Sequence, residues 1–168
     1  MTTLELDAQQ KVFRNAMASM AAAVTVITTN GTAGRSGITA TAVCSITDTP
    51  PTIMVCINRN SRTNATLKEN QYLCVNILSA EQLEIAKHFA GMTEVPMSDR
   101  FMLHNWKEGS QKIPVLEGAL ANLQGKISSM SEIGTHTLFL VELNEIQIKE
   151  TGNSLTYFNR TFHEIPRN

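Results

Sequence analysis

The sequence lacks paired cysteines, a basic excess and any long apolar run, and each absence excludes a class of protein. Its three cysteines, Cys44, Cys56 and Cys74, form no CxxC motif, and each lies within an apolar, strand-like run. This pattern predicts buried, reduced thiols in a cytoplasmic protein rather than a disulfide scaffold. The formal net charge is -1, which is not the basic balance typical of nucleic-acid-binding proteins.

Signals for membranes, metals and hydrolysis are absent as well. No apolar run approaches the roughly 20 residues of a membrane-spanning helix, and the acidic, polar start MTTLELDAQQ is unlike a signal peptide. The histidines show no HxH or HxxxH spacing, so we expect no metal site. There is also no GxSxG nucleophile motif and no GxGxxG dinucleotide fingerprint. We therefore expect no membrane, metal or nucleic-acid partner.

The composition is that of a folded globular chain. Hydrophobic residues make up 42% of the 168 residues and charged residues 17%, which argues against disorder. A chain of this length can bury one real core but not two. No repeat, low-complexity tract or linker divides it, so we expect a single domain over residues 1–168.

Capping signals predict two helices. Asp7 and Gln10 have capping-box spacing, and an apolar face follows at helical intervals. A second capping box pairs Ser79 with Gln82, and Gly91 is placed to end that helix. Strand-like runs lie at residues 23–29, 37–47, 52–58, 72–78, 119–133, 135–149 and 154–158. This order predicts a mainly β protein with a few helices, folded as a closed or split antiparallel barrel.

The run GITATAVCSITDTPP, residues 37–51, alternates small residues with hydroxyls. Taken as one strand, it would turn Ala42 and Cys44 towards the core and Thr39, Thr41 and Ser45 to the other face. Threonine favours strands for packing reasons alone. Small hydroxyls also let a flat ligand approach and offer it donors. The pattern leaves both interpretations open.

Polar residues gather after the apolar run at 52–58. Arg59 and Arg62 are charged donors suited to phosphate oxygens, and neutral donors surround them. A solvated loop that caps a helix is the alternative. Nearby in the chain, Asn76 interrupts an apolar strand, so its amide must find a backbone or ligand partner.

The segment IGTHTLFLVE, residues 133–142, holds the best catalytic candidate. Gly134 permits unusual dihedral angles or a close approach, and His136 follows just before an apolar strand. A single histidine at a strand start is more often structural or exposed than functional. The residues alone therefore leave its role open.

Segments spread along the chain resemble the short flavin reductases, the small partners of two-component, flavin-dependent monooxygenases. In chain order they are FRNAMASMAAAVTVITT, GITATAVCSITDTPPTIMVCIN, LCVNIL, HFAG, RF, PVLEGALANLQGKI, IGTHTLFLVE and LTYFNRTFH. They extend from about Phe13 to His163. The resemblance implies an FMN-binding split β-barrel, usually a homodimer, that reduces free FMN or FAD with NADH or NADPH. The reduced flavin would pass to an oxygenase component acting on an aromatic compound.

The resemblance also implies roles for particular residues. His136 would place the nicotinamide and is the expected catalytic residue. The family motif Gly-Asp-His aligns with Gly134, Thr135 and His136, so Thr135 replaces the acidic residue. The expected cofactor-binding residues are Thr39, Ala40, Thr41, Ser45, Asn58, Arg59, Ser61, Thr63, Asn64, Phe89, Ala90, Gly134 and His136.

Two other functions are compatible with the same fold. One is a non-catalytic flavin-binding module. Only His136 and the resemblance argue against it. The other is a flavoenzyme like pyridoxamine-phosphate oxidase, which would hold FMN tightly and carry more basic phosphate ligands than Arg59 and Arg62.

Overall fold

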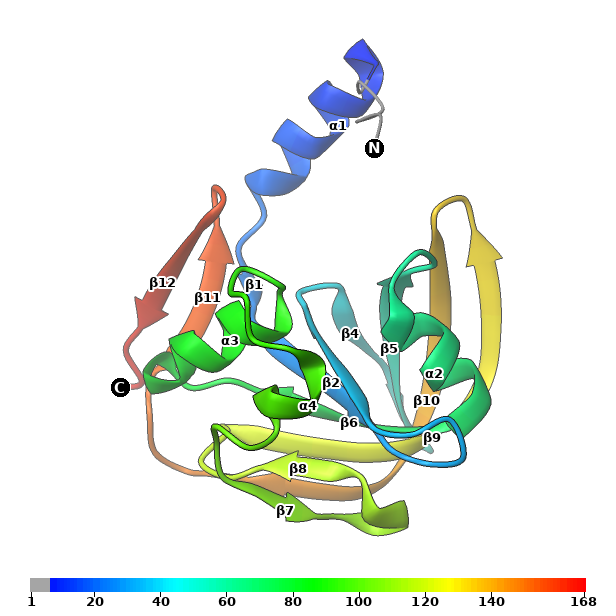
Figure 1. The fold of residues 1–168 in the computed structure, drawn as a ribbon. Coiled ribbons are helices and arrows are strands. Elements are labelled where there is room, and N and C mark those ends of the chain that lie inside the picture. The colour runs from blue at the N-terminus through cyan, green and yellow to red at the C-terminus, as the bar shows by residue number, and fades with distance from the viewer. Residues whose placement is uncertain (1–6) are drawn as a thin grey trace.

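The computed structural model describes residues 7–168 (Figure 1). Its helices are α1 Ala8–Ala18, α2 Arg62–Asn70, the 3-10 turn η1 Ala80–Gln82, α3 Leu83–Phe89, α4 Met97–Arg100 and the 3-10 turn η2 Ser110–Lys112. Its strands are β1 Ala22–Ala23, β2 Thr25–Thr29, β3 Ser36–Ala40, β4 Val43–Asp48, β5 Pro51–Asn58, β6 Tyr72–Ile77, β7 Trp106–Glu108, β8 Pro114–Leu116, β9 Ala121–Ile133, β10 His136–Ile148, β11 Ser154–Phe158 and β12 Thr161–Ile165. No helix in the described part is long and apolar enough to cross a membrane.

A seven-stranded antiparallel sheet organises the molecule. Its strand order is β3-β2-β6-β9-β10-β5-β4, so two strands adjacent in the chain form its opposite edges. Only Thr41 and Ala42 join those edges, which requires the sheet to curl until the edges approach each other at this point. A smaller sheet, β1-β11-β12, and the β7–β8 pair complete the fold. The prediction of a mainly β, antiparallel protein is confirmed.

One predicted strand, residues 37–47, is wrong as a single element. It consists of β3, which pairs with β2, and β4, which pairs with β5. The amide of Val43 donates to the carbonyl of Thr41 across the break. This tight turn interrupts the two-residue alternation, so the faces expected of a continuous strand do not persist beyond Ala40.

The second correction concerns burial. Strand β5 alternates between buried and partly exposed residues, although the run at 52–58 is almost continuously apolar. Cys44 is exposed and Cys56 half-buried, while only Cys74 is fully buried. Ala42 is exposed as well. The expectation that Ala42 and Cys44 face the core, and that all three thiols are buried, is therefore wrong for the described chain.

Cys44 and Cys56 belong to an apolar face of the sheet that points away from the core. Cross-strand register places Cys44 opposite Met54 and Met54 opposite Leu140, and it places Cys56 opposite Leu138. Directly paired residues share a face. We call this set, Cys44, Met54, Cys56, Leu138 and Leu140, the outer face.

Helix α1 forms as its caps predict. Asp7 Oδ1 accepts from the Gln10 amide, and Gln10 Oε1 accepts from the Asp7 amide. None of its residues is buried by the rest of the described chain, and Figure 1 shows the helix extending away from the sheet. The apolar side chains of Val12 and Phe13 are 68% and 64% exposed, so this amphipathic helix presents an uncovered apolar face.

The core contains a buried amide network centred on Asn76. Its Nδ2 donates to the carbonyl of Val26, and its Oδ1 accepts from the amide of Leu116 and from Nδ2 of Asn122. These bonds join β2, β6, β8 and β9. The prediction that Asn76 must be satisfied is confirmed, and its partners here are protein groups.

Two histidines meet beside helix α3. The rings of His88 and His104 are 5.4 Å apart, and the buried Nε2 of His104 has no hydrogen-bond partner among the described residues. Burial and the charge of His88 lower the pKa of His104, against an opposing effect of Glu84.

His104 should therefore make stability depend on pH. The unfolded chain binds this proton more readily than the folded one. The contribution of neutral His104 to the free energy of unfolding is therefore fully present above about pH 6.5 and is lost as the pH falls below it. When the pH is lowered from about 7.5 to about 5.5, we expect the Tm of His104→Gln to decrease by less than the Tm of the wild type. Thermal unfolding at both pH values measures this, and equal losses in the two proteins would refute it.

Candidate functional site

Three pockets open side by side on one side of the sheet. One pocket, of about 500 Å³, lies between α2 and the β9–β10 turn. Because Arg59 and Lys68, which line it, are the kind of groups that bind phosphate, we call it the phosphate pocket. The histidine pocket, of about 490 Å³, lies between α1 and the same turn. The helix pocket, of about 510 Å³, lies between α1 and the Thr41–Ala42 connection. Thr135 lines the first two pockets, and Phe13 and Arg14 line the last two, so neighbouring pockets adjoin, and we refer to the three together as the groove.

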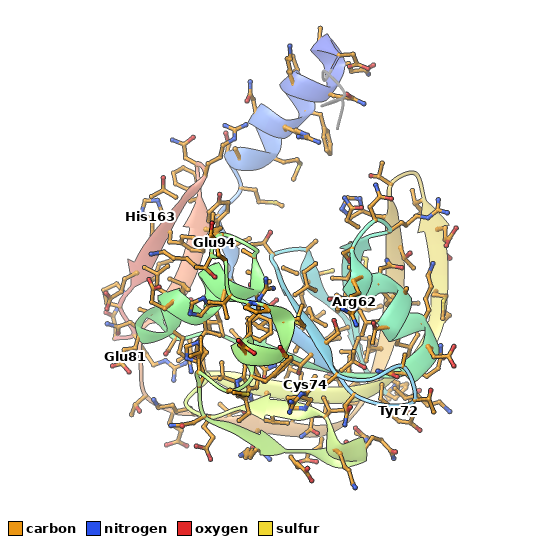
Figure 2. All side chains as sticks on the ribbon, in the orientation of Figure 1. Arg62, Tyr72, Cys74, Glu81, Glu94 and His163 are labelled. Atoms are coloured by element: carbon orange, nitrogen blue, oxygen red, sulfur yellow. The ribbon has the colours of Figure 1, made fainter. Side chains whose placement is uncertain are left out.

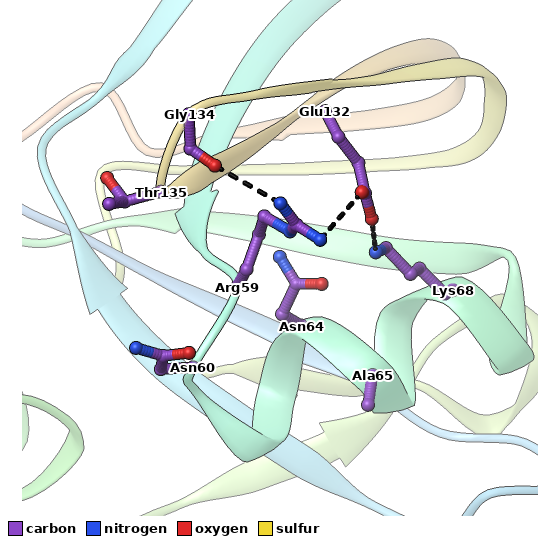
Figure 3. Close-up of a pocket in the computed structure, with 8 residues that line it drawn as sticks. All are labelled: Arg59, Asn60, Asn64, Ala65, Lys68, Glu132, Gly134 and Thr135. Atoms are coloured by element: carbon purple, nitrogen blue, oxygen red, sulfur yellow. Dashed lines mark hydrogen bonds and ion pairs between the residues drawn. The ribbon is translucent and has the colours of Figure 1, made fainter.

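The phosphate pocket is lined by cations and amides. Figure 3 shows Arg59 and Lys68 on either side of Glu132. One Arg59 nitrogen lies 2.8 Å from a Glu132 oxygen, and Lys68 Nζ lies 2.5 Å from the other. The hydrogen bond from Lys68, together with the charge of Arg59, lowers the pKa of Glu132 and keeps it ionised.

Local sequence explains the position of these groups. Ser61 caps α2 by accepting the Asn64 amide at 3.1 Å. Asn64, Ala65 and Lys68 then lie on one face of this helix, because residues three and four apart are neighbours, and that face lines the pocket. Arg59 also donates to the carbonyl of Gly134, which fixes the β9–β10 turn against the start of α2.

That turn carries His136. Gly134 has a φ of +55°, a conformation that favours glycine. The exposed His136 begins β10 opposite Asn58, and its Nδ1 lies 2.9 Å from Oγ1 of Thr135. The threonine hydroxyl lies beside the imidazole and can orient the ring without adding charge.

The helix pocket has an apolar side and a polar end. Phe13 and Met17 of α1, and Met20 just after it, face the exposed Thr41 and the side chains of Tyr157 and Arg160. The C-terminal hairpin holds the helix in place, since Nη2 of Arg160 donates to Oδ1 of Asn15 and the amide of Asn159 donates to the carbonyl of Ala18.

Some predicted site residues line this groove, namely Thr41, Arg59, Asn64, Gly134 and His136. Others make bonds within the protein. Thr39 donates to the carbonyl of Ala86, and Thr63 Oγ1 bonds to Ser36 and Gly37. Phe89 is 2% exposed and packs edge-on against Phe101 and Trp106.

The remaining predicted residues do not line these pockets. Ala40 is half-buried in β3, and Ser45, Asn58 and Ala90 are exposed. Arg62 is exposed at the start of α2 and does not join Arg59 in the phosphate pocket. The cation that does so is Lys68.

Sequence reasoning missed Lys68 and Glu132. The helical spacing between Asn64 and Lys68 could have placed the lysine on the same side as the predicted Asn64. No local pattern could have found Glu132, because only the register of β9 and β10 brings it to α2.

Comparison with known proteins agrees with this architecture. Residues 17–166 match the family model described as a flavin reductase like domain. The chain is 62% identical to the 4-hydroxyphenylacetate 3-monooxygenase reductase component of Pseudomonas aeruginosa, covering 96% of this chain and 95% of that one. It therefore belongs to the flavin reductase family.

Solved structures of flavin reductases share the fold. One is the flavin reductase PheA2, with a TM-score of 0.85 and 31% identity, covering 96% of this chain and all of that one. Another is the NADH:FAD oxidoreductase SgcE6 of Streptomyces globisporus, in complex with NAD and FAD fragments. It has a TM-score of 0.84 and 27% identity, and the match covers 95% of each chain.

Proposed function

We propose that this chain is an NAD(P)H-dependent flavin reductase that reduces free FMN or FAD in the cytoplasm. It would supply the reduced flavin to an oxygenase component, that of 4-hydroxyphenylacetate 3-monooxygenase, in the degradation of aromatic compounds. The observation that carries the proposal is the groove of adjoining pockets, which has paired cations at one end and His136 beside it. The high identity to a reductase component supports the choice of partner.

The donors in the groove suit the two cofactors. Arg59 and Lys68, with the side-chain amide of Asn60, fit a phosphate group. The apolar face of α1 and the small residues at Thr41–Ala42 fit a flat ring. When bound, the nicotinamide would supply a hydride and the flavin would accept it.

The protein itself contributes position and shielding rather than acid–base chemistry. Thr135 orients the imidazole of His136, and that ring holds the nicotinamide at the groove. The side chains of α1 exclude water from one side. No proton donor is required at the reacting atoms.

The proposal includes a homodimer built on a split barrel. The curled sheet with converging edges supports the barrel. The apolar face of α1 is exposed and the outer face is partly exposed, and apolar surfaces of this kind mark interaction sites in soluble proteins. A second copy that covers them would also close the open side of the groove beside α1.

The dimer predicts a specific effect of charge on the outer face. Leu140→Lys should yield a monomer, because burying an unpaired ammonium at the interface would raise the dimer Kd by roughly a hundredfold or more. Ile148→Lys is the matched control, since Ile148 lies on the same strand and is 75% exposed. Analytical ultracentrifugation reports both, and a Leu140→Lys dimer as tight as the control would refute this interface.

Reconstitution with the oxygenase tests whether this chain acts as its reductase component. Purified oxygenase component of 4-hydroxyphenylacetate 3-monooxygenase, NADH, flavin and 4-hydroxyphenylacetate are combined with and without this chain. We expect NADH-dependent hydroxylation only when both proteins are present. Flavin reduction without any hydroxylation would leave the reductase activity but reject this partner.

A further inference from the structure

The phosphate pocket already contains an anion. The two carboxylate oxygens of Glu132 are divided between its cations, one bound to Arg59 and the other to Lys68 (Figure 3). Glu132 reaches the two cations from β9. Arg59 lies just before α2, and Lys68 lies within that helix. Its carboxylate therefore occupies the position that a phosphate between these two cations would take.

Stability does not account for this arrangement. The side chains of Arg59, Lys68 and Glu132 are 46%, 32% and 45% exposed. Ion pairs between exposed side chains contribute little, because water and salt screen them. The pairing has a larger effect on the pocket itself, where one carboxylate leaves two cations with a single net positive charge. A phosphate monoester carries a charge of about -1.5 to -2 near neutral pH, so this pocket compensates it only in part.

We propose that Arg59 and Lys68 form a phosphate subsite and that Glu132 weakens it by competing with the phosphate for both cations. The inference rests on the proposed function only in taking a nucleotide as the ligand. The group bound is a nucleotide phosphate, either the 5′-phosphate of FMN or the 2′-phosphate of NADPH. Weak retention of this group suits a protein that must release its flavin to another enzyme.

Glu132→Gln tests the competition, because the amide keeps the shape of the side chain and removes its charge. Riboflavin lacks only the phosphate of FMN, and NADH lacks only the 2′-phosphate of NADPH. Equilibrium titrations followed by fluorescence give Kd for each ligand without turnover. We expect the riboflavin-to-FMN ratio of Kd, or the NADH-to-NADPH ratio, to rise about fivefold in the variant. The ratio that rises identifies the source of the phosphate.

Two further variants separate local from general effects. Glu81→Gln removes the same charge on the other side of the molecule from α2 (Figure 2) and should leave both ratios unchanged. Lys68→Met should lower the ratio that Glu132→Gln raises. Lys68 is a cleaner choice than Arg59, because Arg59 also holds the turn through the carbonyl of Gly134.

The outcomes decide the proposal in either direction. Ratios that stay unchanged in Glu132→Gln would overturn it, and so would a fall, which would mean that Glu132 orients the cations instead. Thermal unfolding should show almost the same Tm for Glu132→Gln and the wild type. If the wild type oxidises NADH but the ratios do not move, this inference alone fails. If the ratios rise in a protein that reduces no flavin, the proposed function fails and the phosphate subsite remains.

Discussion

Replacement of His136 by alanine should raise the KM for NADH by about tenfold or more while changing the KM for flavin less than about twofold. The reason is position. The imidazole is exposed at the groove and is fixed by the Thr135 hydroxyl 2.9 Å away, whereas the flavin would be held by the phosphate pocket and α1. Losing the ring therefore removes contacts to the nicotinamide only. Steady-state kinetics with each substrate varied in turn measure the two constants.

His163→Ala is the matched control for this prediction. His163 is also an exposed histidine, but it lies on β12, and its Nε2 contacts the carbonyl of Phe158 outside the groove. Both kinetic constants should remain as in the wild type. An unchanged KM for NADH in His136→Ala would show that the histidine does not place the nicotinamide.

Replacement of Asn76 by leucine should lower the free energy of unfolding by about 2–4 kcal/mol. The side chains have similar volume, so the main loss is that of hydrogen bonds. The amide of Leu116, the carbonyl of Val26 and the side chain of Asn122 would each lose a buried partner. Because Asn76 is fully buried, water cannot replace these bonds. Chemical denaturation followed by circular dichroism measures the difference.

The same substitution at Asn144 serves as the control, since Asn144 is an exposed asparagine on the neighbouring part of the sheet. Its replacement by leucine should change stability by less than about 0.5 kcal/mol. A loss below about 1 kcal/mol in Asn76→Leu would mean that the network does not hold these strands together.

Local chemistry in the sequence predicted much of the fold. The capping box at Asp7, the second one at Ser79 and the glycine at position 91 mark helix ends that the structure confirms. The strands at 119–133, 135–149 and 154–158 are found as β9, β10 and β11 within a few residues. These signals depend on neighbours in the chain, so they are readable without the fold.

Other features depend on distant partners and were not predictable in this way. The break at Thr41–Ala42 exists because β3 and β4 pair with different strands at opposite edges of the sheet. Burial was overestimated on the outer face, since an apolar pattern shows that a surface is to be covered but not by which molecule. In the site, Glu132 meets Arg59 and Lys68 only through the register of the β9–β10 hairpin.

Catalytic turnover of free flavin tests the central claim most directly. The wild-type protein is mixed with a large excess of FMN or FAD and NADH under anaerobic conditions, and NADH absorbance is followed. We predict that each protein molecule oxidises many molecules of NADH, with one flavin reduced for each. Flavin binding without NADH consumption would contradict the claim and indicate a binding module. A tightly held flavin that is not exchanged and that yields peroxide with another substrate in air would contradict it in favour of an oxidase.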